Sequence, residues 1–176
     1  MTIVWIQSHL LSEAQNGMLK FRYLDANSNS GFIINLLEII NEKWSNIYWG
    51  VGDIEIIPRY KGDYPGYGQN KSIEVAFDFG NKVEREKIAY LTLSQFMEVL
   101  DDTQTIRNAV LICFPNDVPF DYNLRPRVEA KDHNKIQHEL AQLEIRILDG
   151  DLFCILAKEN EVILLLEEQM QEFILT

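Results

Sequence analysis

A turn signal between two apolar runs, Asp149-Gly150-Asp151, constrains the fold of this 176-residue chain more than any other local feature. Asp-Gly between two runs of apolar residues is a strong short-range signal for a β-hairpin. We therefore expect strands at residues 144–148 and 152–157, joined by this turn. Such a locally connected antiparallel pair argues against an all-helical fold and against a regular alternation of parallel strands and helices.

Helical periodicity is clearest at residues 32–44, where apolar side chains recur at the spacing of one helix face. Thr92 and Gln95 have the spacing of a capping box, which predicts a short helix from residue 93 to 100. Ile136, Leu140 and Leu143 suggest a second long helix from about residue 130 to 143, and residues 161–173 close the chain as another helix.

Further strands are predicted from apolar, aromatic and alternating runs. Residues 2–7 and 18–24 are expected to pair, with a turn at Asn16-Gly17. The other predicted strands are residues 47–57, 72–79, 83–91 and 110–114, of which 72–79 alternates cleanly and 83–91 should pair back to it across Gly80-Asn81. Gly50 and Gly52 mark a bulge or a close backbone approach in the first of these strands.

Length and element order together predict one domain spanning residues 1–176, because a chain of this size can build a self-sufficient core. Strands joined mostly by hairpins, with helices between them, indicate an α+β fold. We expect a single domain with a mixed or mainly antiparallel sheet covered by helices on one face.

The net charge of −11, from 16 Lys and Arg against 27 Asp and Glu, disfavours nucleic acid as a partner, because phosphate binding needs clustered basic residues. It favours rapid association with a basic protein. The excess of Asp and Glu over Lys and Arg is largest in residues 151–176. This segment is interpreted either as a solvent-exposed acidic helix or as an acidic surface that binds a positively charged partner. Apolar runs fall short of the roughly 18 residues of a membrane span, so no membrane partner is expected.

Motifs for catalysis, cofactors and metals are missing from the sequence. His133 and His138 are five residues apart, which on the predicted helix would separate them by about 140°. Cys113 and Cys154 lie in apolar runs and are expected to be buried thiols. We therefore predict no catalytic residue, cofactor or metal ligand, and a protein that is not an enzyme. The N-terminal apolar stretch is too short for a secretory signal, which indicates a cytoplasmic location.

Aromatic and acidic residues supply the candidate partner-binding surface, because Tyr and Trp give large contact area at low entropic cost. The predicted contact residues are Tyr48, Asp53, Tyr60, Asp63, Tyr64, Tyr67, Glu167 and Glu168. In the alternative reading these aromatics fold onto the sheet edge and fill a small secondary core. A different alternative is a small enzyme or ligand-binding module, whose site is formed by the loops 58–71 and 115–127.

One segment resembles a known kind of protein. Residues 73–80, read as a strand and a Gly turn, are followed at 88–100 by a second strand and a capped short helix. This pattern, over about residues 72–101, resembles the bacterial immunity proteins of polymorphic or contact-dependent toxin systems. The resemblance implies a cytoplasmic protein that binds and neutralises one cognate toxin domain, often a basic nuclease, by blocking its active site or a substrate-binding surface. The toxin-facing residues of such proteins vary, so the resemblance transfers none of them.

Overall fold

The computed structural model describes residues 6–9, 17–59 and 71–174, and the elements within them confirm the α+β class. The strands are β1 (Ile6–His9), β2 (Gly17–Arg22), β3 (Ile47–Pro58), β4 (Ile88–Leu91), β5 (Thr103–Pro115), β6 (Leu143–Leu148) and β7 (Leu152–Ala157). The helices are α1 (Ser30–Lys43), α2 (Lys71–Glu86), α3 (Leu93–Asp101) and α4 (Asn160–Ile174). None of the helices among these residues is long and apolar enough to cross a membrane.

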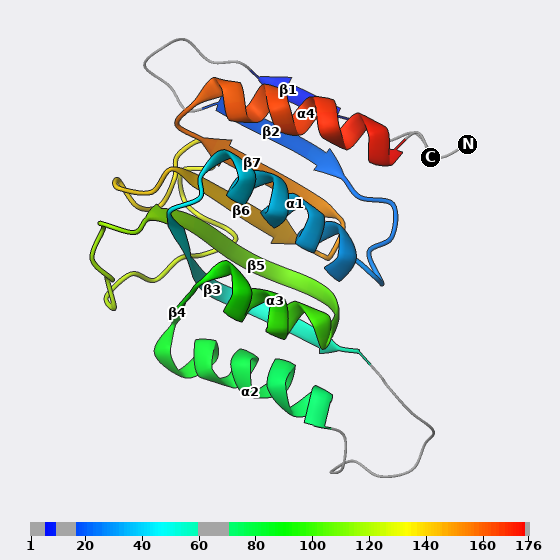
Figure 1. Cartoon of the computed structure of the whole chain (residues 1–176), viewed down its shortest axis with the longest axis vertical. Coiled ribbons are helices and arrows are strands. Elements are labelled where there is room, and N and C mark those ends of the chain that lie inside the picture. Colours follow the sequence, from blue (N-terminus) through cyan, green and yellow to red (C-terminus); the bar gives the residue numbers. More distant parts are fainter. Residues whose placement is uncertain (1–5, 10–16, 60–70, 175–176) are drawn as a thin grey trace.

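All strand pairs in the seven-stranded sheet are antiparallel, in the order β1-β2-β7-β6-β5-β3-β4. The predicted pairing of the first two strands is confirmed, with Ile6 opposite Phe21. The predicted hairpin of β6 and β7 is also confirmed: Leu148 pairs with Leu152, so residues 149–151 form the connecting loop, in which Asp149 and Gly150 both have a positive φ. Strand β4 therefore forms one edge of the sheet and β1 forms the other (Figure 1).

The helices cover one face of the sheet, as predicted. Alternate residues of the central strand β5 define the two faces: Leu111 and Cys113 belong to the core shared with the helices, while Val110 and Ile112 belong to a smaller cluster on the other side. That second side is covered by residues 116–142, which we call the covering segment. In Figure 1 helices α1, α3 and α4 cross in front of the sheet, and the yellow covering segment lies behind it.

Local capping chemistry accounts for α3. The Gln95 backbone N–H donates to Thr92 Oγ1 at 3.2 Å, and the Thr92 backbone N–H donates to Gln95 Oε1 at 2.9 Å. These two bonds form the predicted capping box and satisfy backbone donors that the first helical turn cannot pair. Helix α3 thus begins immediately after β4, at the edge of the sheet.

The Asn29 side chain, directly before α1, joins distant elements and does not cap the helix. It occupies the N-cap position of α1 but makes no side-chain cap bond. Its amide instead donates to the carbonyls of Ile106 and Gly150 at 2.7 and 2.8 Å and accepts from the Ile106 N–H at 2.8 Å. Asn29 is fully buried, so it joins the start of α1 to β5 and to the β6–β7 turn while pairing groups that would otherwise be desolvated.

The strand predicted at residues 72–79 is wrong, because this segment belongs to helix α2. Ala76, Phe79 and Val83 are buried at positions i, i+3 and i+7, which is one face of a helix. Val75 and Phe77, which strand alternation would bury, are 42 % and 60 % exposed. Gly80-Asn81 lies within the helix, and the strand predicted at 83–91 is reduced to β4.

The helix predicted at about residues 130–143 is also wrong, because this part of the covering segment is irregular. The Arg146 guanidinium donates to the carbonyl of Lys135 at 2.6 Å and more weakly to that of His133 at 3.4 Å. A strand side chain therefore takes backbone acceptors that a helix would have used itself. Ile136 still packs against the smaller cluster, so the apolar spacing reflects burial against the sheet and not helix formation.

Candidate functional site

Three aromatic side chains gather where β3, β4 and β5 end on the face that the covering segment overlies. Tyr48 of β3 lies opposite Phe114 of β5 in register, and the two rings stack at 5.2 Å between centroids. Tyr90 of β4 pairs with Gly50, and its ring meets that of Tyr48 edge to face at 5.6 Å. A Cβ on Gly50 would lie 3.0–3.1 Å from the Phe114 and Tyr90 rings, so this glycine is the close approach predicted from the sequence.

Two tyrosine hydroxyls fasten the covering segment to these strands. Tyr48 Oη donates to the Val118 carbonyl at 2.8 Å. Tyr90 Oη donates to the Asp121 carbonyl at 2.7 Å and accepts from the Asp121 N–H at 3.0 Å. The backbone between residues 118 and 121 is thereby held at both ends by side chains that are themselves packed in the sheet.

Phe120 and Tyr122 complete what we call the aromatic platform, which consists of Tyr48, Tyr90, Phe114, Phe120 and Tyr122. Phe120 stacks on Tyr90 with 4.5 Å between centroids and 5° between ring planes, and Tyr122 meets both of these rings edge to face. Phe120 is nevertheless 48 % exposed and Tyr122 64 % exposed. Two large aromatic side chains thus reach solvent from a base that restricts their motion, which lowers the entropy lost when a partner binds them.

Carboxylates border the platform. Asp117 is exposed, and Asp121 lies between Phe120 and Tyr122 in the chain. Asp121 Oδ2 is 3.8 Å from His138 Nε2, and the His138 ring packs edge to face on Phe114 at 5.0 Å. The platform therefore combines an apolar centre with an acidic edge, which suits a protein surface that carries Lys or Arg.

Burial changes the acid–base behaviour of the platform. It raises the pKa of Tyr90 to about 12, and the hydrogen bond from the Asp121 backbone N–H offsets only part of this effect. Burial also raises the pKa of Tyr48 to about 12, with a further contribution from the negative charge of Asp117. Both hydroxyls are therefore protonated at neutral pH and can donate to the carbonyls that they hold.

We expect the titration of Tyr90 to report whether the platform is formed. The folded-state pKa of about 12 lies above the ordinary tyrosine value of 10.0, so the stability that protonated Tyr90 contributes is complete below pH 10 and is lost as pH rises toward 12. The absorbance at 295 nm, measured for the wild type minus Tyr90→Phe, should rise near pH 12 in native protein and near pH 10 in urea. A native rise near pH 10 would show that Tyr90 is solvated and the platform open.

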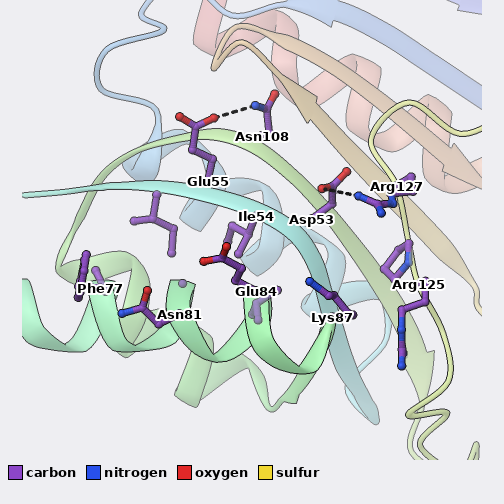
Figure 2. A pocket seen from close by; sticks show the side chains of 15 residues that line it. Asp53, Ile54, Glu55, Phe77, Asn81, Glu84, Lys87, Asn108, Arg125 and Arg127 are labelled. Atoms are coloured by element: carbon purple, nitrogen blue, oxygen red, sulfur yellow. Dashed lines mark hydrogen bonds and ion pairs between the residues drawn. The ribbon is translucent and has the colours of Figure 1, made fainter.

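A cavity of about 470 Å³ lies between α2, β3 and residues 125–127 of the covering segment (Figure 2). It sits where β3 bulges, because the register with β5 shifts between Gly52 and Glu55. Asp53 within this bulge has a φ of 47° and accepts a hydrogen bond from the Val128 N–H at 2.8 Å. A Cβ on Gly52 would lie 2.3 Å from Pro126, so this glycine lets the covering segment approach the strand.

Comparisons of the chain with protein-family models, curated proteins and solved structures found no match.

The structure separates the partner-binding residues predicted from the sequence. Tyr48 is only 5 % exposed and supports the platform from below. Asp53 lines the cavity, where it lies 3.7 Å from Arg127. Glu167, which is half-buried, and exposed Glu168 lie on α4, which covers the opposite face of the sheet. Tyr60, Asp63, Tyr64 and Tyr67 lie outside the described residues.

The alternative site predicted from loops 58–71 and 115–127 agrees with the cavity only in part. Residues 125–127 line it, but the other lining residues come from β3, α2, Asn108 of β5 and Lys87 between α2 and β4. Residues 60–70 of the first loop lie outside the described residues.

Cys113 and Cys154 are buried and unpaired, as predicted. Burial raises the pKa of both thiols, although the positive charge of Arg146 acts in the opposite direction on Cys154. Both are therefore poor nucleophiles in the folded protein. Within residues 6–9, 17–59 and 71–174, no group of three or more His, Cys, Asp or Glu side chains is arranged to hold a metal ion.

Proposed function

We propose that this protein is a non-enzymatic interaction protein that binds a basic protein domain through the aromatic platform. We further propose that it is an immunity protein, which acts in the cytoplasm and neutralises a cognate toxin domain. The observation that carries the proposal is the pair Phe120 and Tyr122, held on a packed aromatic base and yet exposed.

The platform supports a protein partner more than a small molecule because its exposed rings project from the surface. Tyr and other aromatic residues that are surrounded by packed neighbours dominate the binding energy of protein interfaces. The two hydroxyl-to-carbonyl contacts at Val118 and Asp121 hold the platform before a partner arrives, so less ordering is required on binding.

Charge supports a basic partner. The net charge of −11 attracts a positive protein over a distance of about one Debye length, roughly 8–10 Å at physiological salt. Asp117 and Asp121 place negative charge directly at the platform edge. A basic toxin domain would thus be steered to the surface that carries the aromatic contacts.

The resemblance to immunity proteins retains part of its structural basis. Strand β4, the Thr92 cap and α3 are formed at residues 88–101 as the pattern requires. The first part of the segment is helical instead of extended, so the pattern is carried by its second half alone.

Co-expression tests this proposal. The chain is produced together with the C-terminal domain encoded by the gene immediately upstream, in cells that this domain alone prevents from growing. We expect growth to be restored and a 1:1 complex to co-purify, with a dissociation constant on the order of nanomolar that weakens as salt is raised. Persistent toxicity in the presence of folded, expressed chain, or an upstream domain that neither harms cells nor binds, would overturn the proposal.

Matched charge variants identify which acidic face guides the partner. Asp117→Asn with Asp121→Asn and Glu167→Gln with Glu168→Gln each remove two negative charges, on opposite sides of the sheet. We expect the first pair to lower the association rate several-fold and to flatten its salt dependence, because its charges border the contact. The second pair should have a smaller effect, as measured by stopped-flow fluorescence. A larger effect of the second pair would place the interface on α4, which carries two of the predicted contact residues, Glu167 and Glu168.

A further inference from the structure

The cavity between α2 and β3 brings together several features that cost stability. Gly80 lies in the middle of α2 and lines the cavity, and a Cβ added there would meet nothing within 4 Å. Glycine destabilises a helix interior relative to alanine, so a position with free space would ordinarily favour alanine. Because Gly80 has no side chain, the helix backbone at this position is accessible from the cavity.

Backbone strain borders the same space. Asp53 and Lys87 are non-glycine residues with φ values of 47° and 72°, and both line the cavity. Residues in this conformation are uncommon, and they concentrate at ligand-binding and catalytic sites because the surrounding structure must hold them there. Asp53 lies in the bulge of β3, and Lys87 directly follows the last residue of α2, so two breaks in regular structure border this cavity.

A row of exposed side chains on and just beyond α2 lines the cavity. Phe77, Asn81 and Glu84 follow one another along the helix, with Lys87 just beyond its end, as Figure 2 shows. Phe77 is 60 % exposed. The side chains of Asn81, Glu84 and Lys87 are exposed and make no hydrogen bond or ion pair with other described residues. The row therefore offers an aromatic surface, an amide, an acceptor and a cation in that order.

Other charges at the cavity are already engaged. Asp53 accepts from the Val128 N–H and lies beside Arg127, and Glu55 accepts from the Asn108 amide at 2.9 Å. Arg125 donates to the carbonyls of Tyr122 and Leu124. Lys87 is consequently the cation most available to a ligand, and Glu84 the carboxylate most available to donor groups.

We propose that this cavity binds a nucleoside monophosphate, with the base on Phe77 and Asn81, the ribose hydroxyls at Glu84 and the phosphate at Lys87. Ten residues separate Phe77 from Lys87, which is about 15 Å of helix and matches a nucleotide better than a single amino acid. Asn amides pair with base edges, carboxylates accept from ribose hydroxyls, and Lys is a common phosphate ligand. The cavity volume of about 470 Å³ lies within the range of small-molecule sites.

Calorimetric titration tests this inference with adenosine, guanosine, cytidine and uridine 5′-monophosphates as probes. We expect at least one to bind with a dissociation constant below about 1 mM, and its nucleoside and inorganic phosphate each to bind about tenfold more weakly or worse. The absence of binding by all four nucleotides would overturn the inference. Equal affinity for inorganic phosphate alone would overturn it too, because the ring contact would then have no role.

Variants locate the site. Gly80→Leu should weaken nucleotide binding at least about tenfold while the melting temperature is unchanged or higher, because the new side chain fills the cavity and not the core. Lys87→Asn tolerates the positive φ and should weaken the nucleotide but not the nucleoside. Lys82→Asn, on α2 but not in the lining, is the matched control.

Unchanged binding by Gly80→Leu would place the ligand elsewhere. This inference does not depend on the proposed function, since its variants leave the platform intact.

Discussion

Replacing Arg146 by methionine is expected to destabilise the protein by about 3–5 kcal/mol, a large part of the 5–15 kcal/mol typical of a domain. Arg146 is 2 % exposed, and its Nε donates to Glu144 Oε1 at 2.5 Å. Glu144 is fully buried, so Arg146→Met leaves a carboxylate without its counter-ion in a site that water does not reach. The Lys135 carbonyl loses its donor as well. Urea unfolding followed by tryptophan fluorescence measures the change in free energy.

Two further variants separate the buried charge from the loss of arginine packing. Arg107→Met removes an exposed arginine that lies 3.7 Å from Glu55, and should cost less than about 1 kcal/mol. Glu144→Met combined with Arg146→Met removes both charges and should recover part of the stability lost by Arg146→Met alone, because no desolvated charge remains although the Gln137 N–H loses its acceptor. A cost for Arg146→Met within about 1 kcal/mol of that for Arg107→Met would mean that water reaches the Glu144 carboxylate.

The ion pair explains why the covering segment was hard to predict. Gln137 donates from its backbone and side chain to Glu144, and the same side chain is hydrogen-bonded to both the N–H and the carbonyl of Arg127. These bonds join residues seven and ten positions apart through side chains in an irregular segment, so the spacing of apolar residues gives no sign of them. One sequence feature does indicate the ion pair. Glu144 and Arg146 are two residues apart, so they share one face of a strand whose other face is apolar.

Helix α2 shows how two periodicities can coexist in one run. Residues 73–79 alternate as a strand would, but the burial of Ala76, Phe79 and Val83 follows the helical spacing. Two of the alternating apolar residues have different surroundings in the structure: Phe79 packs in the core, and Phe77 lines the cavity. The exposed aromatic residue Phe77, which lines the cavity, therefore completed a pattern that matches strand alternation.

Elements with strong local signals were predicted well. Helix α1 has a complete apolar stripe, α3 has a capping box, and the β6–β7 hairpin has Asp-Gly at its turn. The strand order could not be predicted, because it depends on which apolar faces pair across the whole chain. The platform was missed for the same reason: Tyr48, Tyr90 and Phe114 come from three strands that meet only in the folded sheet.

Replacing Phe120 and Tyr122 together by alanine is expected to weaken binding of the proposed basic partner domain by about 2–4 kcal/mol, or roughly 30- to 1000-fold. The two rings supply the exposed centre of the platform, and truncation removes both their contact area and their restricted geometry. The loss should appear mainly as faster dissociation, since the charges that guide association are retained. Surface plasmon resonance at fixed salt separates the two rates.

Leu164→Ala is the matched control, because Leu164 has the same 48 % exposure as Phe120 but belongs to α4, on the helix-covered face. Its binding should equal that of the wild type. Phe77→Ala removes another exposed aromatic ring, at the cavity instead of the platform, and should also leave binding of the proposed partner unchanged. A twofold effect or less for the platform variant would show that the exposed aromatic pair is not the contact, and a large effect for Leu164→Ala would place the contact on α4.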